Sequence, residues 1–215
     1  APSAPTLTGY GYTKNTWNSS KIIPSNKWHN GYGMVRASGS IDTLSGGVYY
    51  VSEADKSTVT SGSTRGSDRQ VTSQNTHTVY FKACDKVNNC SATKSFVLKL
   101  DWTAPGCNSS GGNGNWTNGN RTISGTCTDG ISGCVGNVSK TISTNTNSSV
   151  SPGTVRDNAG NTTSCPGQTV KVDKTMPYVT VDIQPGTFED NDGFDVTITC
   201  HDSLSGLSGT FDKSY

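Results

Sequence analysis

Apolar and polar residues alternate with a period of two in many short segments of this chain. Clear examples are residues 78–83, 96–100, 121–127 and 196–200, where Val, Ile, Leu and Phe alternate with Thr, Ser and Lys. Such alternation is typical of antiparallel strands with one buried and one solvated face. Clusters of Asn, Asp and Gly separate the segments and indicate turns. No segment of useful length has the i, i+3, i+4, i+7 spacing of an amphipathic helix, so we predict an all-β protein.

Two short motifs recur and divide the chain into three copies of one unit. The first is a linker that ends in proline, at 101–105 and 173–177, of which only the last two residues remain at 4–5. Proline cannot continue a central strand, so we interpret this motif as a separator between domains. The second motif is a strand followed by an Asp-x-(Leu/Ile)-Ser-Gly loop. These loops lie at 42–46, 129–133 and 202–206.

Copies one and two also share a hairpin whose turn begins with aspartate, at 85–89 and 157–161. Copy three lacks this hairpin. Short strands at regular spacing predict an antiparallel β-sandwich for each copy. The predicted domains are 1–102, 103–174 and an N-terminal part of a third, 175–215. Half a sandwich cannot bury its inner face, so we expect either that the natural chain continues or that something else supplies the missing strands.

The linker, the Asp-x-(Leu/Ile)-Ser-Gly loop and the Asp-x-Ala-Gly-Asn turn together resemble the bacterial immunoglobulin-like repeats of large surface proteins and adhesins. Copy two matches best, through 129–133 and 157–161, whereas the turn at 85–89 lacks the glycine. The resemblance implies tandem immunoglobulin-like antiparallel β-sandwiches, the last one incomplete in this chain. It also implies an extracellular location, either secreted or attached to the cell wall. It does not specify a ligand, because such sandwiches host many functions.

The composition agrees with small polar β domains. The chain is 30% hydrophobic and 15% charged and contains 25 glycines. Its net charge of +1 gives no indication of a nucleic-acid partner. No apolar run reaches the roughly 20 residues that a transmembrane helix needs, so we expect no membrane insertion in this segment.

The acidic residues of these motifs are predicted to meet where one copy joins the next. In a sandwich of this topology, the linker, the loop after the second strand and the turn of the last hairpin lie at the same end. Carboxylate and amide oxygens on loops are ligands of Ca²⁺, and the resemblance implies calcium at such junctions, where it stiffens a rod. The alternative is that Asp and Asn only cap turns. The predicted site residues are Asp101, Asp129, Asp157 and Asn161 at the first junction and Asp173 and Asp202 at the second.

Seven cysteines in a polar, glycine-rich chain indicate an oxidising compartment. Cys84 and Cys90 flank the turn of the first hairpin, so we predict that they pair with each other. The absence of C-x₂-C spacing and of paired histidines argues against zinc.

The four cysteines of copy two allow three pairings, and the repeat helps to choose among them. Cys200 holds the place of Cys127, whereas Val179 and Leu207 hold the places of Cys107 and Cys134. If all copies follow one plan, the partner of Cys127 is neither of those two residues. The resulting hypothesis pairs Cys127–Cys165 and Cys107–Cys134 and leaves Cys200 unpaired in this chain.

We expect a structural role rather than catalysis, because the three histidines form no recognisable catalytic constellation. The predicted function is a spacer or stalk in a bacterial cell-surface or secreted protein. One alternative is an adhesin module that binds a glycan or a host protein, either through its loops or through the first-copy segment that contains Tyr10, Tyr12, Trp17 and Trp28. Another is a self-assembling filament or surface-layer subunit, in which copies of the chain complete one another by strand donation.

Overall fold

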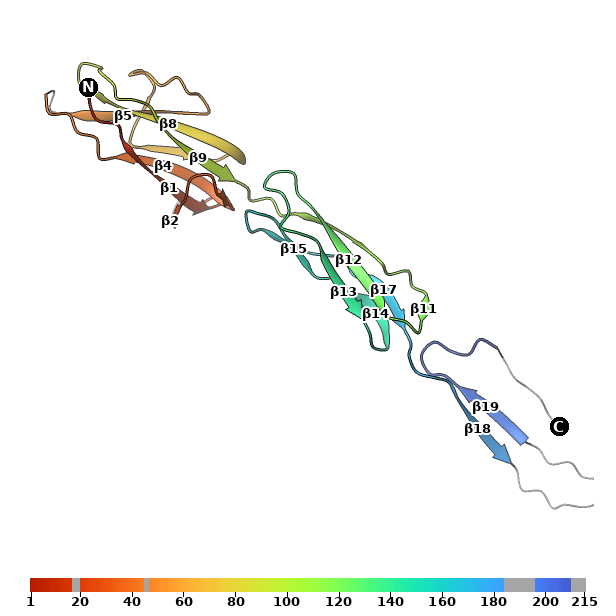
Figure 1. Ribbon diagram of the computed structural model, residues 1–215. Coiled ribbons are helices and arrows are strands. Elements are labelled where there is room, and N and C mark those ends of the chain that lie inside the picture. Colours follow the sequence, from red (N-terminus) through yellow and green to blue (C-terminus); the bar gives the residue numbers. More distant parts are fainter. Residues whose placement is uncertain (17–19, 45–46, 184–195, 210–215) are drawn as a thin grey trace, which may run out of the picture. The chain divides into compact units, whose positions relative to one another are not determined.

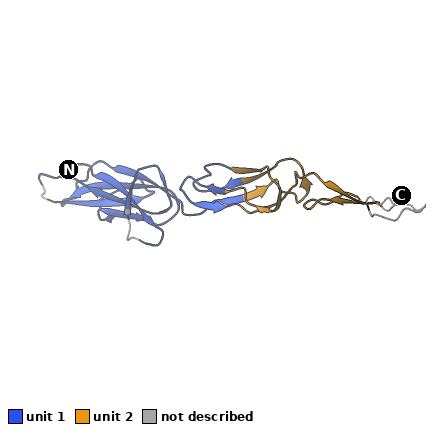
Figure 2. Cartoon of the chain, turned by 90° about the horizontal axis from the view of Figure 1, so that it is seen from below, with its two compact units in different colours: residues 1–107, 126–137, 154–164 blue, residues 108–125, 138–153, 165–215 orange. Residues whose placement is uncertain are grey.

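The computed structural model of the chain describes residues 1–16, 20–44, 47–183 and 196–209. Every regular element in these residues is a β-strand, which confirms the all-β prediction (Figure 1). The chain forms two compact units (Figure 2). Unit 1 comprises residues 1–107, 126–137 and 154–164, and unit 2 comprises residues 108–125, 138–153 and 165–215. Unit 1 therefore contains the first copy together with the acidic loop and turn of the second copy. Within the described residues, no helix could cross a membrane.

The first copy folds into two sheets, with strand orders β2-β1-β4-β7 and β3-β9-β8-β5-β6. All neighbouring strands are antiparallel except β3 and β9, which are parallel. The strands are β1 (Thr6–Thr13), β2 (Ser20–Ile23), β3 (Trp28–His29), β4 (Gly31–Ser38), β5 (Val48–Ala54), β6 (Thr64–Arg65), β7 (Asp68–Val71), β8 (Asn75–Asp85) and β9 (Lys94–Leu100).

The inner faces of these two sheets share one hydrophobic core. Each sheet contributes residues two positions apart, as the alternation predicts: Val35 and Ala37 come from β4, and Leu98 and Leu100 come from β9. The remaining buried members are Ile23, Val71, Val79 and Phe81. Two sheets packed face to face on one core form a β-sandwich.

The rest of the chain also consists of small β-sheets, two of which share a smaller core. Its sheets have the strand orders β10-β12-β13, β11-β17-β14, β15-β16 and β18-β19. In unit 2, Ile123 and Ile142 of the first of these sheets share a core with Val170 and Val172 of the second. The strands are β10 (Gly106–Ser110), β11 (Trp116–Thr117), β12 (Arg121–Thr128), β13 (Val138–Ile142), β14 (Thr146–Val150), β15 (Thr154–Arg156), β16 (Thr162–Ser164), β17 (Gln168–Val172), β18 (Tyr178–Ile183) and β19 (Val196–His201).

Trp28 and Trp116 occupy equivalent positions in the two copies. Each opens a two-residue strand that runs parallel to the last strand of its copy. The ammonium groups of Lys99 and Lys171 lie over the two indole rings, each 5.7 Å from the ring centroid. This repeated arrangement gives the two tryptophans a packing role in their own copies.

We predict that Leu98→Ala lowers the free energy of unfolding of unit 1 by about 2–5 kcal/mol, because it leaves a cavity in the core. Leu98 is 1% exposed. Leu44 is 94% exposed and serves as the matched control; Leu44→Ala is expected to change stability by less than about 0.5 kcal/mol. Urea unfolding monitored by tryptophan fluorescence measures both values. Equal effects of the two substitutions would contradict the core assignment.

Candidate functional site

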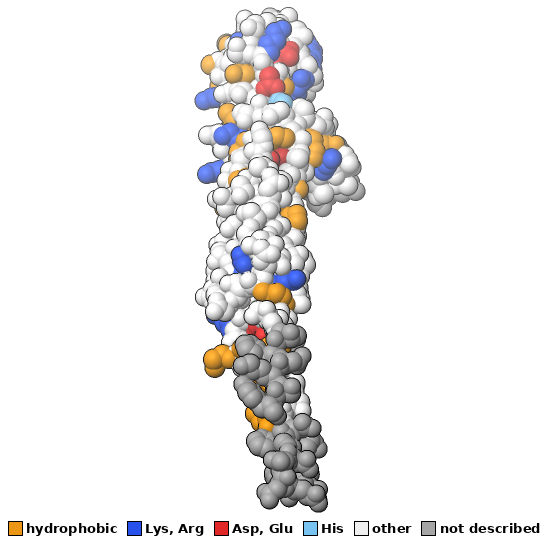
Figure 3. Space-filling view, turned by 90° about the vertical axis from the view of Figure 1, so that its right-hand side faces the viewer, with side chains coloured by type: hydrophobic (Ala, Val, Ile, Leu, Met, Phe, Trp, Pro, Cys, Tyr) orange, Lys and Arg blue, Asp and Glu red, His pale blue; other side chains and the backbone are white. Residues whose placement is uncertain are grey.

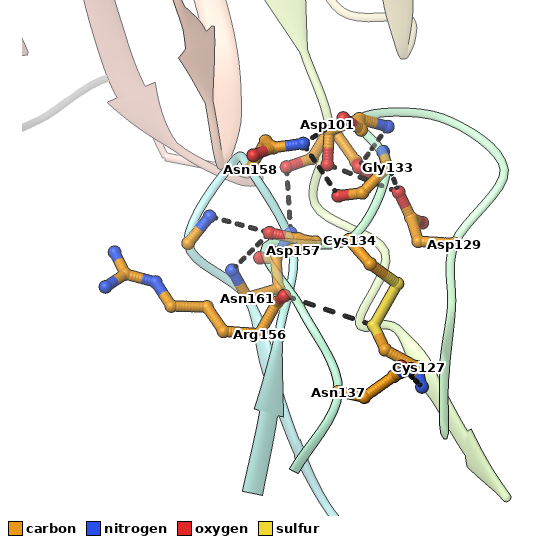
Figure 4. The surroundings of a disulfide bond; sticks show 12 residues. Asp101, Cys127, Asp129, Gly133, Cys134, Asn137, Arg156, Asp157, Asn158 and Asn161 are labelled. Carbon is orange, nitrogen blue, oxygen red and sulfur yellow. Dashed lines mark hydrogen bonds between the residues drawn. A yellow bond between two sulfur atoms is a disulfide. The ribbon is translucent and has the colours of Figure 1, made fainter. Parts of the chain in front are cut away.

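Three aspartates from three separate segments converge in unit 1 (Figure 4). Asp101 follows β9, Asp129 follows β12, and Asp157 follows β15. One carboxylate oxygen of each lies within 4.8 Å of those of the other two. Asp101 and Asp157 are fully buried, and Asp129 is half-buried. The structure thus brings together the three carboxylates that the repeat predicts at the first junction.

The linker aspartate is hydrogen-bonded by residues of the following copy. Asp101 Oδ1 accepts the backbone N–H of Thr103 at 2.9 Å, and Oδ2 accepts the backbone N–H of Ser132 at 3.1 Å. The side-chain amide of Asn161 donates to the backbone oxygens of Asp101 and Thr103, both at 3.1 Å. The loop at 129–133 and the turn at 157–161 therefore both hold the linker.

Asp129 and Asp157 also close their own turns. Asp129 Oδ2 accepts the backbone N–H of Gly133 and the hydroxyl of Ser132. Asp157 Oδ1 accepts the backbone N–H groups of Gly160 and Asn161 at 2.6 and 2.8 Å. This is the capping role that was the alternative to metal binding, and the structure shows it directly.

The role of Asn161 differs from the predicted one. We expect its amide to supply a ligand oxygen, but in the structure its amide nitrogen shares its two hydrogens among three acceptors, the two linker oxygens and Asp157 Oδ2 at 2.7 Å. A carboxylate and two carbonyls surround the amide, so it is the –NH₂ group that faces them.

Two further residues of the site were not singled out from the sequence. Ser132 supplies the N–H that binds Asp101, and its recurrence in all three Asp-x-(Leu/Ile)-Ser-Gly loops was an available signal. Asn158 donates its amide to the backbone oxygens of Ser132 and Gly133, at 2.8 and 3.1 Å. The repeat gives no signal for Asn158, because the first copy has Lys86 at that place.

The turn of the first copy is also capped by its aspartate, although it lacks the glycine. Asp85 Oδ1 accepts the backbone N–H groups of Val87 and Asn89, and Oδ2 accepts the Asn89 amide. The fourth turn residue adopts a left-handed conformation in both copies, with φ of 69° at Asn88 and 99° at Gly160. Asparagine tolerates this conformation better than most residues, so it replaces the glycine here.

The second junction repeats part of this arrangement within unit 2. Asp173 Oδ1 accepts the N–H of Thr175 at 2.9 Å, and Oδ2 accepts the N–H of Ser205 at 3.0 Å. Asp202 accepts the hydroxyl of Ser205 and the N–H of Leu204. The structure thus brings Asp173 and Asp202 together on one serine, as the linker and loop of the first junction are joined.

These hydrogen bonds lower the pKa of both carboxyls at the second junction. Hydrogen bonding by Ser205, and then by the backbone of Thr175, lowers the pKa of Asp173. The backbone N–H of Leu204 makes the largest contribution to the lowered pKa of Asp202. The stabilisation is therefore present above the unfolded-state pKa of each carboxyl and is lost as the pH falls through its lowered folded-state value.

The disulfides confirm one predicted bridge and correct two others. Cys84 pairs with Cys90, as predicted. Cys127 pairs with Cys134, so the predicted pairs Cys127–Cys165 and Cys107–Cys134 are both wrong. Cys107 and Cys165 are each disulfide-bonded as well, and Cys200 is free. Disulfides of this number indicate an oxidising environment.

The error has a clear physical origin. We assumed that each copy uses the same bridges, and copy three has Leu207 at the place of Cys134. In the structure, Cys127 at the end of β12 lies next to the returning end of its own loop, with 6.1 Å between the Cα atoms of Cys127 and Cys134. This bridge closes the loop that holds Asp101 (Figure 4). A bridge over so short a loop stabilises by about 2 kcal/mol.

The donor set at the first junction fits a hard divalent cation. Ca²⁺ binds oxygen ligands at about 2.3–2.6 Å, so two ligands of one ion lie at most about 5 Å apart. The oxygens of Asp101, Asp129 and Asp157 meet this spacing. Two carboxylates 4.8 Å apart repel each other by about 3–4 kcal/mol at an effective dielectric constant of about 20. The hydrogen-bond donors described above for these carboxylates are neutral N–H and hydroxyl groups, so a cation would supply the positive charge that these donors lack.

Comparisons of this chain with protein-family models, with curated proteins and with solved structures found no match.

A non-reducing peptide map is expected to recover Cys84–Cys90 and Cys127–Cys134 as linked peptides and Cys200 as a free thiol. The short sequence separations, six and seven residues, make both bridges local. A peptide joining Cys127 to Cys165 would contradict the structure and restore the pairing inferred from the repeat.

We predict that Gly160→Ala destabilises unit 1 by about 1–3 kcal/mol, because its φ of 99° is strained for alanine. The added Cβ would also lie 3.1 Å from the Arg156 guanidinium. Gly130→Ala is the control, since a Cβ there meets nothing within 4 Å. Thermal unfolding of the two variants tests the difference, and an equal melting temperature would argue against the turn geometry.

Proposed function

We propose that this chain is a spacer or stalk, built of tandem immunoglobulin-like β-sandwiches, in a bacterial cell-surface or secreted protein. One observation carries the proposal: the linker residue Asp101 is buried and is hydrogen-bonded by the Ser132 loop and the Asn161 turn of the next copy. A linker that is bound by the module after it transmits orientation from one module to the next. That is the task of a stalk.

The fold and the disulfides support this function. The first copy buries its core between two sheets, and a second, smaller core joins strands of the next copy. Cores of this size are marginal, and disulfides are the usual means of stabilising small domains outside the cell. A polar chain with few charges, held by local bridges, is suited to that environment.

Removing the Asn161 side chain, whose amide holds the linker backbone, is expected to loosen the first junction. In Asn161→Ala, the linker oxygens of Asp101 and Thr103 lose their side-chain donor, at a cost of about 1–3 kcal/mol. ¹⁵N relaxation would show that residues of β8 and β9 tumble together with residues of β15 and β16 in the wild type, and more independently in the variant.

Asn158→Ala is the matched control for this experiment. Its amide lies in the same turn but donates to Ser132 and Gly133 in the loop rather than to the linker. We expect this variant to retain most of the common tumbling. Independent tumbling already in the wild type would refute the stalk proposal.

We further propose that Ca²⁺ binds between Asp101, Asp129 and Asp157. The ion would neutralise the repulsion between the three carboxylates and would connect the linker to the loop and the turn. This part of the proposal is supported by the spacing of the three oxygens and by the burial of two of the carboxylates.

Saturating Ca²⁺ is expected to raise the melting temperature, by the equivalent of about 2.7 kcal/mol at one hundred times the dissociation constant. Asp129→Asn removes one of the three charges and should abolish most of this response. Asp42→Asn is the control, because Asp42 begins the same loop motif in the first copy. A melting temperature of the wild type that stays the same both after treatment with a chelator and on adding Ca²⁺ to the chelator-treated protein would exclude the ion.

A further inference from the structure

The β18–β19 hairpin has one wholly apolar face. Opposite residues of an antiparallel pair point to the same side of the sheet. One side carries the pairs Val179–Cys200, Val181–Ile198 and Ile183–Val196. The other side carries Tyr178–His201, Thr180–Thr199 and Asp182–Thr197. We call the first set the apolar face of the hairpin.

This apolar face is open to solvent in the described part of the chain. Val179, Val181 and Ile183 are 56–60% exposed, and Ile198 is 46% exposed. The space-filling view shows hydrophobic side chains exposed at several places on the surface (Figure 3). Apolar side chains concentrated on one exposed face are uncommon on a folded protein and mark an interaction surface.

The two other copies show what covers the equivalent face. In unit 1, β9 covers the β1–β4 pair: Leu98 and Leu100 lie where a side chain at Gly33 would extend. In unit 2, Val170 and Val172 of β17 pack with Ile123 of β12. Both covering strands read apolar-Lys-apolar at their ends, Leu98-Lys99-Leu100 and Val170-Lys171-Val172. The covering element is thus a strand with alternating aliphatic residues and lysine on its outer side.

Cys200 is a second distinctive feature of this face. Six cysteines are disulfide-bonded, and Cys200 alone is free. Its counterpart Cys127 bonds to Cys134 within the same loop, but Leu207 stands at that place in copy three. Cys200 therefore has no thiol available within its own loop, and it lies on the apolar face opposite Val179.

We propose that the apolar face of the β18–β19 hairpin is a docking surface for a β-strand layer of the β9 and β17 type, with alternating Val or Leu residues facing the hairpin. This proposal does not depend on the stalk function. A second copy of the same hairpin is the competing occupant, and the experiment below separates the two.

The experiment uses the whole chain and a synthetic peptide of residues 166–174, which contains β17. Alkylation of Cys200 reports cover of the apolar face, because Cys200 is the free thiol. We expect saturating peptide to slow alkylation at least about tenfold. A peptide carrying Val170→Asp and Val172→Asp is expected to have no effect. Equal alkylation rates with and without the unmodified peptide would overturn the proposal.

Two chain variants make the test specific for one face. Val181→Asp places a charge on the apolar face and should abolish protection by the peptide, whereas Thr180→Asp on the opposite face should retain it. Both residues are exposed, so unit 1 should unfold as in the wild type. Equal loss in both variants would overturn the proposal. Concentration-dependent dimers that protect Cys200 without peptide would also overturn it, in favour of a second copy.

Discussion

The burial of Asp101 is the constraint on which the first junction depends. A carboxylate that is fully buried must have its oxygens hydrogen-bonded, since an unpaired buried charge costs several kcal/mol. Thr103 of the linker supplies one donor, and Ser132 of the next copy supplies the other. If the linker moved away from the loop, the buried Asp101 carboxylate would lose the hydrogen bond that Ser132 donates to it. The Cys127–Cys134 bridge and the cap made by Asp129 both fix the loop that carries this donor.

A comparison of the two junctions separates the hydrogen bonds that the linker and loop form by themselves from those that require the last hairpin. Asp173, Asp202 and Ser205 reproduce the linker-to-loop contact with nearly the same distances. The third contributor at the first junction is the turn that carries Asp157 and Asn161, and copy three lacks this turn. Linker and loop thus form a pair by themselves, while the clamp on the linker backbone comes with the last hairpin.

Much of this could be predicted from the sequence, because it follows from periodicity and from repeats. Alternation identified the strands, and the placement of acidic motifs at the same end of each copy identified Asp101, Asp129 and Asp157 as neighbours. The disulfides could not be predicted in the same way, because Cys127 and Cys134 are a variation within one copy and the repeat argues against them. The direction of the Asn161 amide could not be predicted either, because it depends on the atoms that surround it in the fold. Asn88 takes the place of a glycine because it adopts the same left-handed backbone conformation.

In the second copy, one region covers the face that corresponds to the apolar face of the hairpin and also holds the linker. In the second copy, one stretch of chain supplies both Asn161, which clamps the linker, and Val170 and Val172, which cover the core. The turn and the covering strand lie fewer than twenty residues apart and belong to one hairpin region. A layer that docks on β18–β19 and carries such a turn would therefore bury the apolar face and bring an amide to the Asp173 linker in one step. Cover of the core and the amide donor to the linker backbone come from one region of the second copy, so the two are coupled in this architecture.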